Sequence, residues 1–421
     1  MNCKLEEKIV IDLVDKYGSP LYVFHVDDFI QRYSDLLGKM QASYSKYNIA
    51  YSYKTNYTPK ICELVKRLGG LAEVVSDMEY SLAKKIGYTD DKIIFNGPLK
   101  GDVLETYLKS GGKANVDNLD ELNRIIKYSY DYPDVLFNIA FRVNIDIGQG
   151  FVSRFGLDAY EDISKDKESE LNKAFEMVNG IDNIKVVGLH CHIGKSRSLE
   201  AWSNRVKVMF ALIDRYFDEI PEFIDFGSGM NSVMEASLAK QFDSEIPSFS
   251  EYANILCKAV EDRYSSIPYD KKPWLYTEPG TTLISGCMSF ISTVKSIKRV
   301  KNCDFVTFDC SGGNMGDICK MKNLPISIYH NGFDLRKLTD AMFAGYTCLE
   351  NDYIYRGYTG ELAVGDFVQF RNVGSYSNVF KPPFIMPNCS MVQIDDDGNS
   401  EIIKDQESFD DIFGTYHFIN Y

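Results

Sequence analysis

The stretch N-I-A-Y-S-Y-K-T-N, residues 48–56, joins an apolar strand-like run to a lysine, Lys54, at its end. A lysine at the end of a buried strand is costly unless its amine is neutralised, paired or used covalently. A desolvated lysine amine is also the group that forms a Schiff base with a carbonyl compound. Taken alone, Lys54 is more simply interpreted as a side chain that reaches from a strand end to solvent. Residues on the later strands are needed to distinguish this interpretation from a covalent role.

Short apolar runs recur along the chain, and each is followed by a stretch with helical spacing. One such stretch, residues 76–87, ends at Gly87, as helices often do. The eight runs are residues 48–53, 71–76, 92–97, 114–117, 137–144, 184–192, 223–227 and 274–278. Eight strand–helix units predict an α/β fold, a (β/α)8 TIM barrel, whose usual size is roughly 250 residues.

The pattern changes after Gly280, where strand-like runs are separated by Gly, Asn and Asp and few helical patterns remain. This predicts a C-terminal β-domain, which the strand-like segment from Pro20 to Val26 is expected to join. The predicted domains are a barrel over residues 27–283 and a β-domain formed by residues 1–26 plus 284–421.

Charge and cysteine usage exclude several classes of protein. The chain of 421 residues has 46 basic and 60 acidic residues, a net charge of −14, which argues against a nucleic-acid partner. No apolar run is long enough to cross a bilayer, and the first residues lack the pattern of a secretory signal. The ten cysteines contain no C-x-x-C pair, as is typical of reduced thiols. We therefore expect a cytoplasmic protein with no membrane partner.

The residues with chemical potential follow the strands of the predicted barrel, where active sites of this fold lie. Lys54 follows the first strand, and His190 and His192 end the sixth in G-L-H-C-H-I-G. The turn G-S-G, residues 227–229, follows the seventh strand, and Glu278 in Y-T-E-P-G follows the eighth. All of these are expected at one mouth of the barrel, where a glycine turn lets backbone N–H groups approach an anion.

In this order and spacing, the motifs resemble the fold-type III pyridoxal-phosphate (PLP) decarboxylases, the group of diaminopimelate, ornithine and carboxynorspermidine decarboxylases. The resemblance extends from S-P-L-Y-V-F near residue 19 to G-S-Y-S at 374–377. It implies an alanine-racemase-like barrel with a C-terminal β-domain and PLP as the cofactor. It also implies decarboxylation of a small-molecule amino acid by a homodimer with composite active sites.

Carried over residue by residue, the resemblance implies how the cofactor is held. Lys54 would hold PLP covalently, His192 would stack on the pyridine ring, and Glu278 would hydrogen-bond the ring nitrogen. Glu73 matches the family's acidic residue near the lysine. The implied phosphate-binding residues are Gly227, Ser228, Gly229, Gly280 and, from the β-domain, Tyr376.

The resemblance also implies the catalytic set, which is Lys54, Cys348, His192 and Glu278. Cys348, in Y-T-C-L-E-N-D, matches a cysteine that a partner subunit inserts into the site to protonate the product. A carboxylate at the ring nitrogen keeps that nitrogen protonated by charge pairing. Related racemases place an arginine there, so Glu278 favours decarboxylation. Arg154 and Asp352 match a pair that forms between the two subunits.

A metal site is the rival interpretation of the histidine pair. His190 and His192 are two residues apart, so on a strand their side chains share a face and could bind a metal ion. A metal-dependent barrel hydrolase normally needs further histidines from later strands. His25, His330 and His417 do not end a later barrel strand, so no metal is expected.

Several positions depart from the family pattern. Thr281 replaces the arginine of E-P-G-R, and Lys195 replaces the serine after H-I-G. Leu324 replaces an arginine before the P-A-L-Y motif, and Leu349 replaces the acidic residue after the cysteine. Diaminopimelate would leave a charged group unpaired in such a site.

These departures predict a modified or carrier-linked amino acid as the substrate, rather than plain diaminopimelate. Three alternatives stay open: diaminopimelate decarboxylase proper, an amino-acid racemase or epimerase on the same fold, and a non-enzymatic protein-binding relative. Retention of Lys54, His192, Glu278 and Cys348 argues against the last.

Overall fold

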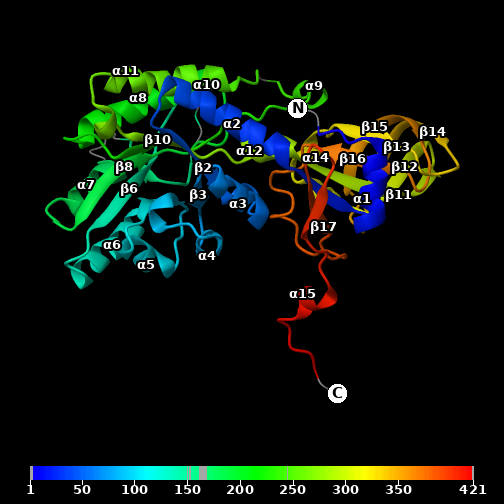
Figure 1. Cartoon of the computed structure of the whole chain (residues 1–421). Helices are drawn as coiled ribbons and strands as arrows, with labels where there is room; N and C mark the ends of the chain where they lie inside the picture. The colour runs from blue at the N-terminus through cyan, green and yellow to red at the C-terminus, as the bar shows by residue number, and fades with distance from the viewer. Residues whose placement is uncertain (1–2, 149, 151–152, 161–167, 244, 420–421) are drawn as a thin grey trace. The chain divides into compact units, whose positions relative to one another are not determined.

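The chain forms two compact units in a computed structural model that describes residues 3–148, 150, 153–160, 168–243 and 245–419 (Figure 1). The first unit contains Tyr33–Asn231 and Glu245–Gly280, and the second contains Met1–Arg32, Ser232–Ser244 and Thr281–Tyr421. The domain boundaries predicted from the sequence, 27–283 against 1–26 plus 284–421, stay a prediction.

The first unit is a closed barrel of eight parallel strands. The strands are β2 (Tyr47–Ser52), β3 (Leu71–Val74), β4 (Ile93–Phe95), β5 (Lys113–Val116), β6 (Phe137–Asn144), β8 (Ile184–His190), β9 (Phe223–Asp225) and β10 (Trp274–Thr277). Their order is β5-β4-β3-β2-β10-β9-β8-β6, and β5 also pairs with β6, which closes the sheet. A two-residue strand, β7 (Leu157–Asp158), pairs with β6. Each of the eight apolar runs predicted as a strand overlaps one of these strands, so the predicted (β/α)8 barrel is confirmed.

Helices alternate with these strands along the chain (Figure 1). They are α2 (Val26–Ser43), α3 (Pro59–Arg67), α4 (Asp77–Ile86), α5 (Val103–Lys109), α6 (Leu119–Asp131), α7 (Glu170–Val178), α8 (Leu199–Tyr216), α10 (Phe249–Ile255) and α11 (Cys257–Tyr264). The residues that begin and end a helix lie next to it in the sequence, as α4 illustrates. The Ser76 hydroxyl accepts a hydrogen bond from the Glu79 N–H at its start, and Gly87 adopts the left-handed conformation at its end.

The second unit is built on a sheet with the order β15-β14-β12-β11-β1-β17-β18, and β16 additionally pairs with β11 and β13. The strands are β1 (Leu21–His25), β11 (Met288–Val300), β12 (Cys303–Phe308), β13 (Ile326–Tyr329), β14 (Arg336–Ala344), β15 (Tyr353–Leu362), β16 (Phe367–Arg371), β17 (Ser390–Ile394) and β18 (Ser400–Lys404). Its helices are α1 (Glu7–Tyr17), α9 (Ala236–Ala239), α12 (Thr281–Ile284), α13 (Gly312–Met315), α14 (Ile318–Met321) and α15 (Phe409–Phe413). The N-terminal strand β1 lies between β11 and β17, so its predicted place in the β-domain is confirmed.

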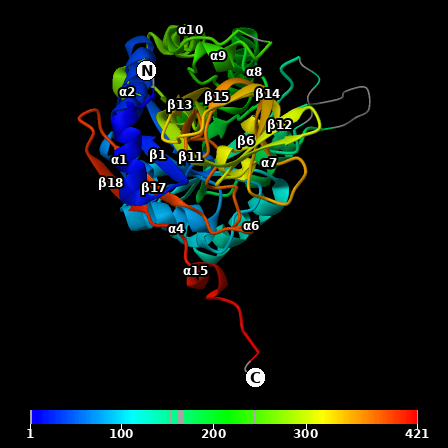
Figure 2. The same cartoon turned by 90° about the vertical axis from the view of Figure 1, so that its right-hand side faces the viewer.

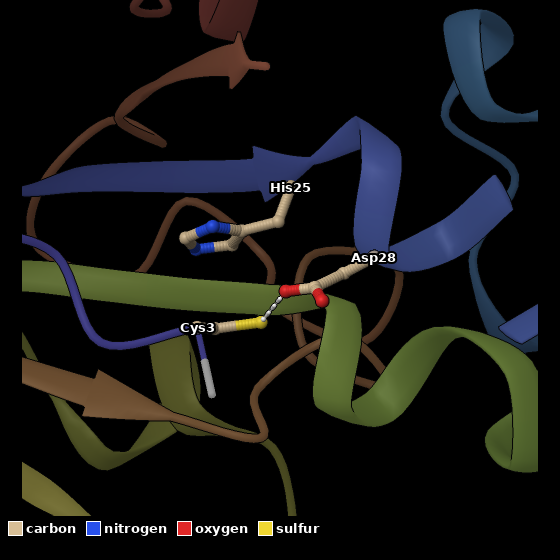
Figure 3. A group of neighbouring side chains, drawn as sticks. All are labelled: Cys3, His25 and Asp28. Carbon is tan, nitrogen blue, oxygen red and sulfur yellow. Dashed lines mark hydrogen bonds between the residues drawn. The ribbon is translucent and has the colours of Figure 1, made fainter. Parts of the chain in front are cut away.

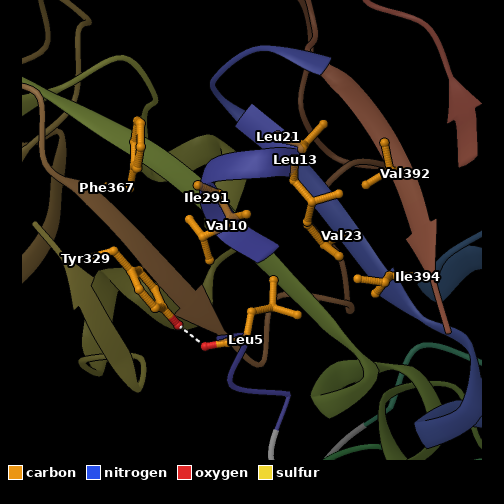
Figure 4. Close-up of a cluster of buried hydrophobic side chains, with 10 residues drawn as sticks. All are labelled: Leu5, Val10, Leu13, Leu21, Val23, Ile291, Tyr329, Phe367, Val392 and Ile394. Carbon is orange, nitrogen blue, oxygen red and sulfur yellow. Dashed lines mark hydrogen bonds between the residues drawn. The ribbon is translucent and has the colours of Figure 1, made fainter. Parts of the chain in front are cut away.

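The N-terminal helix α1 covers the sheet of this unit beside β1 and β17 (Figure 2). Its apolar face, with Val10 and Leu13, packs into a cluster with side chains of β1, β11, β16 and β17 (Figure 4). Tyr329 and Leu5 belong to the same cluster, and the Tyr329 hydroxyl donates a hydrogen bond to the Leu5 carbonyl at 2.7 Å. Segments from both ends of the sequence therefore share one core.

A polar cluster fixes the residues before α1 to the same unit. The Cys3 Sγ lies 2.9 Å from the Asp28 carboxylate (Figure 3). It also lies 2.7 Å from the Gly286 carbonyl, so its one hydrogen has two acceptors within reach. His25 lies beside them, with its Nε2 at 2.8 Å from the Ser289 hydroxyl. Burial raises the pKa of Cys3 and lowers that of His25 to about 4, so both side chains are neutral at pH 7.

Within the described ranges, no helix has the length and apolar character needed to cross a bilayer.

Candidate active site

Lys54 lies in a short 3-10 turn, η1 (Tyr53–Thr55), directly after β2. Lys54 therefore lies two residues past the end of β2, close to the strand end at which it is predicted. Its Nζ forms an ion pair with the Oε2 atom of Glu73, the third residue of β3. The Ser52 hydroxyl donates to the same oxygen at 2.6 Å. The Glu73 side chain is fully buried, whereas that of Lys54 is 31% exposed, so the amine is paired and still accessible.

Glu278 follows β10 and is 1% exposed. Its carboxylate accepts a hydrogen bond from the Asn96 amide. It also lies 3.3 Å from His190 Nε2 and 3.2 Å from His192 Nδ1. Burial alone would raise the pKa of Glu278, but His190, His192 and Lys54 outweigh it and hold this pKa well below the ordinary range. Glu278 is therefore ionised although it is buried.

Asp225, the last residue of β9, is a third buried acid in the site, beside Glu73 and Glu278. Its Oδ1 accepts a hydrogen bond from the Gly227 N–H at 2.8 Å. Burial and the charge of Glu278 raise the pKa of Asp225 well above the ordinary range. The pKa of Asp225 is raised and that of Glu278 is lowered, so Asp225 holds a proton while Glu278 carries the charge.

The backbone of the turn of residues 227–229 is held in place by close contacts with Ile193 and Arg205. Gly229 has φ +99°, and a Cβ there would lie 2.2 Å from the Ile193 carbonyl oxygen, so only glycine fits. Arg205 of α8 is fully buried and donates to the carbonyls of Phe226 (2.9 Å), Ser228 (2.8 Å) and Ile193 (3.0 Å). One of these carbonyls, that of Ser228, belongs to the turn, and the Gly227 carbonyl accepts the Glu278 N–H at 2.8 Å.

Gly280, the other glycine assigned to phosphate binding, lies against the turn that carries Lys54. A Cβ at Gly280 would lie 2.0 Å from the Thr55 hydroxyl oxygen. The approach of the two turns therefore requires glycine at this position.

His192 is partly exposed beside Glu278. Burial lowers its pKa to about 4, against the opposing effect of Glu278, so the imidazole is neutral at pH 7. Its Nδ1 also lies 3.3 Å from the Ser228 backbone nitrogen. The His192 imidazole is neutral and is held through its Nδ1 atom, so the face of its ring could stack on an aromatic ring.

Cys348 and Tyr376 belong to the β-domain unit. Cys348 is exposed, and the half-buried Tyr376 ring lies 5.2 Å from that of Phe380. Asp352 supports the loop of Cys348, because it accepts hydrogen bonds from the Gly312 N–H at 2.7 Å and the Thr347 hydroxyl at 2.6 Å.

Four side chains near the predicted site were not predicted from the sequence: Ser52, Asn96, Arg205 and Asp225. Three of them carried a usable signal, since Ser52, Asn96 and Asp225 end or follow β2, β4 and β9 on the side where the predicted residues gather. Arg205 had none, because it lies inside a helix whose pattern resembles that of any amphipathic helix.

Comparisons with known proteins place this geometry in a family. Residues 28–285, more than half of the chain, match the family described as pyridoxal-dependent decarboxylase, pyridoxal binding domain. This chain belongs to that family. It is therefore a PLP-dependent decarboxylase, a carboxy-lyase.

Individual relatives match most of the chain. The diaminopimelate decarboxylase of Archaeoglobus fulgidus is 26% identical over 417 residues, covering 96% of this chain and 94% of the relative. That of Methanocaldococcus jannaschii is 26% identical over 388 residues, covering 87% and 84%. The solved structure of diaminopimelate decarboxylase from M. jannaschii with L-lysine has a TM-score of 0.81, at 23% identity and 97% and 94% coverage. The arginine decarboxylase of Paramecium bursaria Chlorella virus has a TM-score of 0.74, at 19% identity and 92% and 100% coverage. The structural matches support the fold.

The residues at the barrel mouth fit PLP in their chemistry. Lys54 supplies an accessible amine for a carbonyl group, and Glu278 supplies an ionised carboxylate for a pyridine nitrogen. A glycine turn such as residues 227–229 is a backbone form that binds phosphate through its N–H groups. In this structure the Gly227 N–H donates to Asp225 and the Ser228 N–H donates to His192 Nδ1, so a phosphate bound by these two groups would replace those contacts.

Proposed function

We propose that Lys54 holds PLP covalently at the mouth of the barrel and that the chain decarboxylates a modified or carrier-linked amino acid. One observation carries the assignment of the site. The Lys54–Glu73 ion pair and the Glu278–His190–His192 cluster converge there and are joined through Asn96.

The proposed roles follow from the state of each side chain. PLP, when bound, supplies the electron sink for the electron pair left on Cα as CO2 departs. The ionised Glu278 would keep the pyridine nitrogen protonated. Glu73 would orient Lys54 through their ion pair, and the neutral His192 would cover one ring face. Gly227, Ser228, Gly229, Gly280 and Tyr376 would bind the phosphate.

Cys348 is proposed to protonate the product from a partner subunit in a homodimer. Its exposure supports this, because an exposed thiol can reach another chain. Arg154 is also exposed, with its guanidinium 4.1 Å from the Phe155 ring centroid. The proposed pair between Arg154 and Asp352 of the partner subunit would then place Cys348.

The proposed substrate follows from four side chains that replace polar family residues: Thr281, Lys195, Leu324 and Leu349. Leu324 is 1% exposed and belongs to the core of the β-domain, where it offers no charge. Leu349, next to Cys348, is 53% exposed. An apolar surface there would favour a substrate with a neutral distal end over a free distal ammonium and carboxylate.

Diaminopimelate decarboxylation is the second candidate, favoured by the names of the relatives. Racemisation is disfavoured, because an ionised Glu278 at the ring nitrogen strengthens the electron sink.

The substrate proposal is tested by measuring CO2 release from the purified holoenzyme. The panel contains meso-diaminopimelate, lysine, ornithine, arginine and lysine acylated on its side-chain nitrogen. We expect kcat/KM for the acylated lysine to exceed that for diaminopimelate by about 100-fold, because an unpaired buried charge costs about 3 kcal/mol. Efficient turnover of diaminopimelate would overturn the substrate proposal and leave the decarboxylase assignment intact.

A further inference from the structure

A single side-chain amide joins the two buried carboxylates of the site. Asn96 follows β4 and is 3% exposed. Its Nδ2 donates to Glu73 Oε1 at 2.9 Å and also to Glu278 Oε1. One of these carboxylates faces Lys54 and the other faces His190 and His192.

The neighbours of Asn96 fix the orientation of its amide. Asn115, a fully buried residue of β5, donates its Nδ2 to Asn96 Oδ1 at 2.7 Å. The Asn96 backbone N–H donates to the Val74 carbonyl at 2.8 Å, which ties the residue to the end of β3. A flipped amide would turn its oxygen towards two carboxylates and its NH2 group towards another NH2 group. The observed orientation is therefore the one that satisfies all partners.

An amide suits this position because it donates twice and carries no charge. Two neighbouring carboxylates in a buried site need donors to remain ionised. A lysine or arginine in place of Asn96 would add a second cation beside Lys54 and compete with it for Glu73. An amide stabilises both carboxylates and leaves the charge balance of the site unchanged.

We propose that Asn96 is a positioning residue that holds Glu73 and Glu278 ionised and aligned together. It thereby couples the lysine end of the PLP site to the ring-nitrogen end. This inference rests on the proposed roles of Lys54, Glu73 and Glu278. Asn115 acts one step further out, by fixing the direction of the Asn96 amide.

The titratable groups that act on these two carboxylates come from several elements. Lys54 from η1 pairs with Glu73, and Glu79 from α4 interacts with it electrostatically. His190, His192 and Asp225, from the ends of β8 and β9, surround Glu278. Asn96 differs from these titratable groups because it is an uncharged side chain that donates to both carboxylates.

The test compares two variants, Asn96→Asp and Asn96→Leu. An aspartate among two carboxylates has a raised pKa and donates a hydrogen bond only while it is protonated. Asn96→Asp should therefore keep part of the wild-type function at pH 6, because it donates one hydrogen bond where Asn96 donates two, and lose that part as the pH rises. Asn96→Leu donates at no pH and should be impaired throughout.

The first readout needs no substrate. The visible absorbance of bound PLP is titrated from pH 6 to pH 9 in each protein. We expect an additional transition in Asn96→Asp that is missing from the wild type. With the best substrate of the panel, kcat should fall about 100-fold in Asn96→Leu, and at least 10-fold from pH 6 to pH 9 in Asn96→Asp relative to wild type. KM should change less than kcat.

Asn48→Asp is the matched control. Asn48 of β2 donates to the Gly69 carbonyl at 3.0 Å, and the same substitution there adds a carboxylate to the barrel away from Asn96. Its absorbance titration should match that of the wild type. Asn115→Leu, which leaves the Asn96 donor in place and frees its amide to rotate, should give a smaller loss of kcat than Asn96→Leu.

The outcomes separate this inference from the proposed function. A wild-type absorbance titration and kcat in both Asn96 variants would overturn the role of Asn96. If Asn96→Asp does not fold, an undiminished kcat in Asn96→Leu and Asn115→Leu would do the same. A wild-type chain whose cofactor is not attached to Lys54 would instead overturn the proposed site.

Discussion

At the scale of single residues, the site depends on which buried acids carry charge. Glu278 is ionised because two histidines and Lys54 surround it, and Asp225 beside it keeps its proton. These opposite states follow from position, since both side chains are buried carboxylic acids.

Glu278→Gln should lower kcat by about 100-fold and PLP affinity by less than about 5-fold, because it removes the charge proposed to pair with the ring nitrogen and leaves the proposed phosphate contacts. Equilibrium titration with PLP and steady-state CO2 release measure the two effects separately. A loss confined to PLP affinity, with kcat per bound cofactor intact, would contradict the proposed role of Glu278.

Glu79 should make the stability of the chain depend on pH. Its carboxyl accepts the Val75 N–H at 2.8 Å, and burial together with the charge of Glu73 raises its pKa from 4.5 to about 7. Between these values the folded chain binds more protons at Glu79 than the unfolded chain does. The free energy of unfolding therefore decreases as the pH rises from about 4.5 to 7.

Glu79→Gln keeps an acceptor for Val75 and removes this titration. The free energy of unfolding of the variant minus that of the wild type should be about 2–3 kcal/mol larger at pH 8 than at pH 5. Urea unfolding followed by circular dichroism at the two pH values measures this difference. Glu63→Gln, on the exposed face of α3, is the control and should show no such gain.

At the scale of elements, much of the fold could be predicted because its signals are local. The run 92–97 contains β4, and the stretch 76–87 contains α4, whose ends are set by Ser76 and Gly87. Lys54 and Glu278 could be placed together because parallel strands of a barrel end at one mouth.

The parts of the site that could not be predicted depend on contacts between distant residues. Asn96 and Glu278 are 182 positions apart, and their hydrogen bond depends on how β3, β4 and β10 are arranged in the barrel. Arg205 lies on a helix whose apolar spacing does not indicate a buried guanidinium.

Arg205 links α8 to the turn of residues 227–229, so its loss should affect both the stability of the fold and the proposed phosphate site. Arg205→Met keeps most of the side-chain volume but leaves three carbonyls without their donor. We expect a loss of about 3 kcal/mol or more in the free energy of unfolding and about 10-fold weaker PLP binding. Arg215→Met, at an exposed position of the same helix, is the control for urea unfolding and PLP titration. Unchanged PLP binding would show that Arg205 does not shape the turn.

At the scale of the whole molecule, the proposed homodimer predicts complementation between inactive chains. Lys54→Ala and Cys348→Ala chains, mixed under conditions that allow subunit exchange, should recover about a quarter of wild-type activity, because half of the dimers would hold one intact site.

Lys54→Ala mixed with Glu278→Gln is the control. Both residues lie in the barrel unit of one chain, so no mixed dimer would hold an intact site and no recovery is expected. Absence of recovery in the first mixture, with exchange shown by mass spectrometry, would contradict the composite site.

The most direct test of the central claim is to find where the cofactor is attached. The holoenzyme is reduced with borohydride, digested and mapped by mass spectrometry. We expect the mass of reduced PLP on the peptide that contains Lys54 and no label in a folded Lys54→Ala variant. A label on another lysine, or a label that persists in Lys54→Ala, would contradict the account.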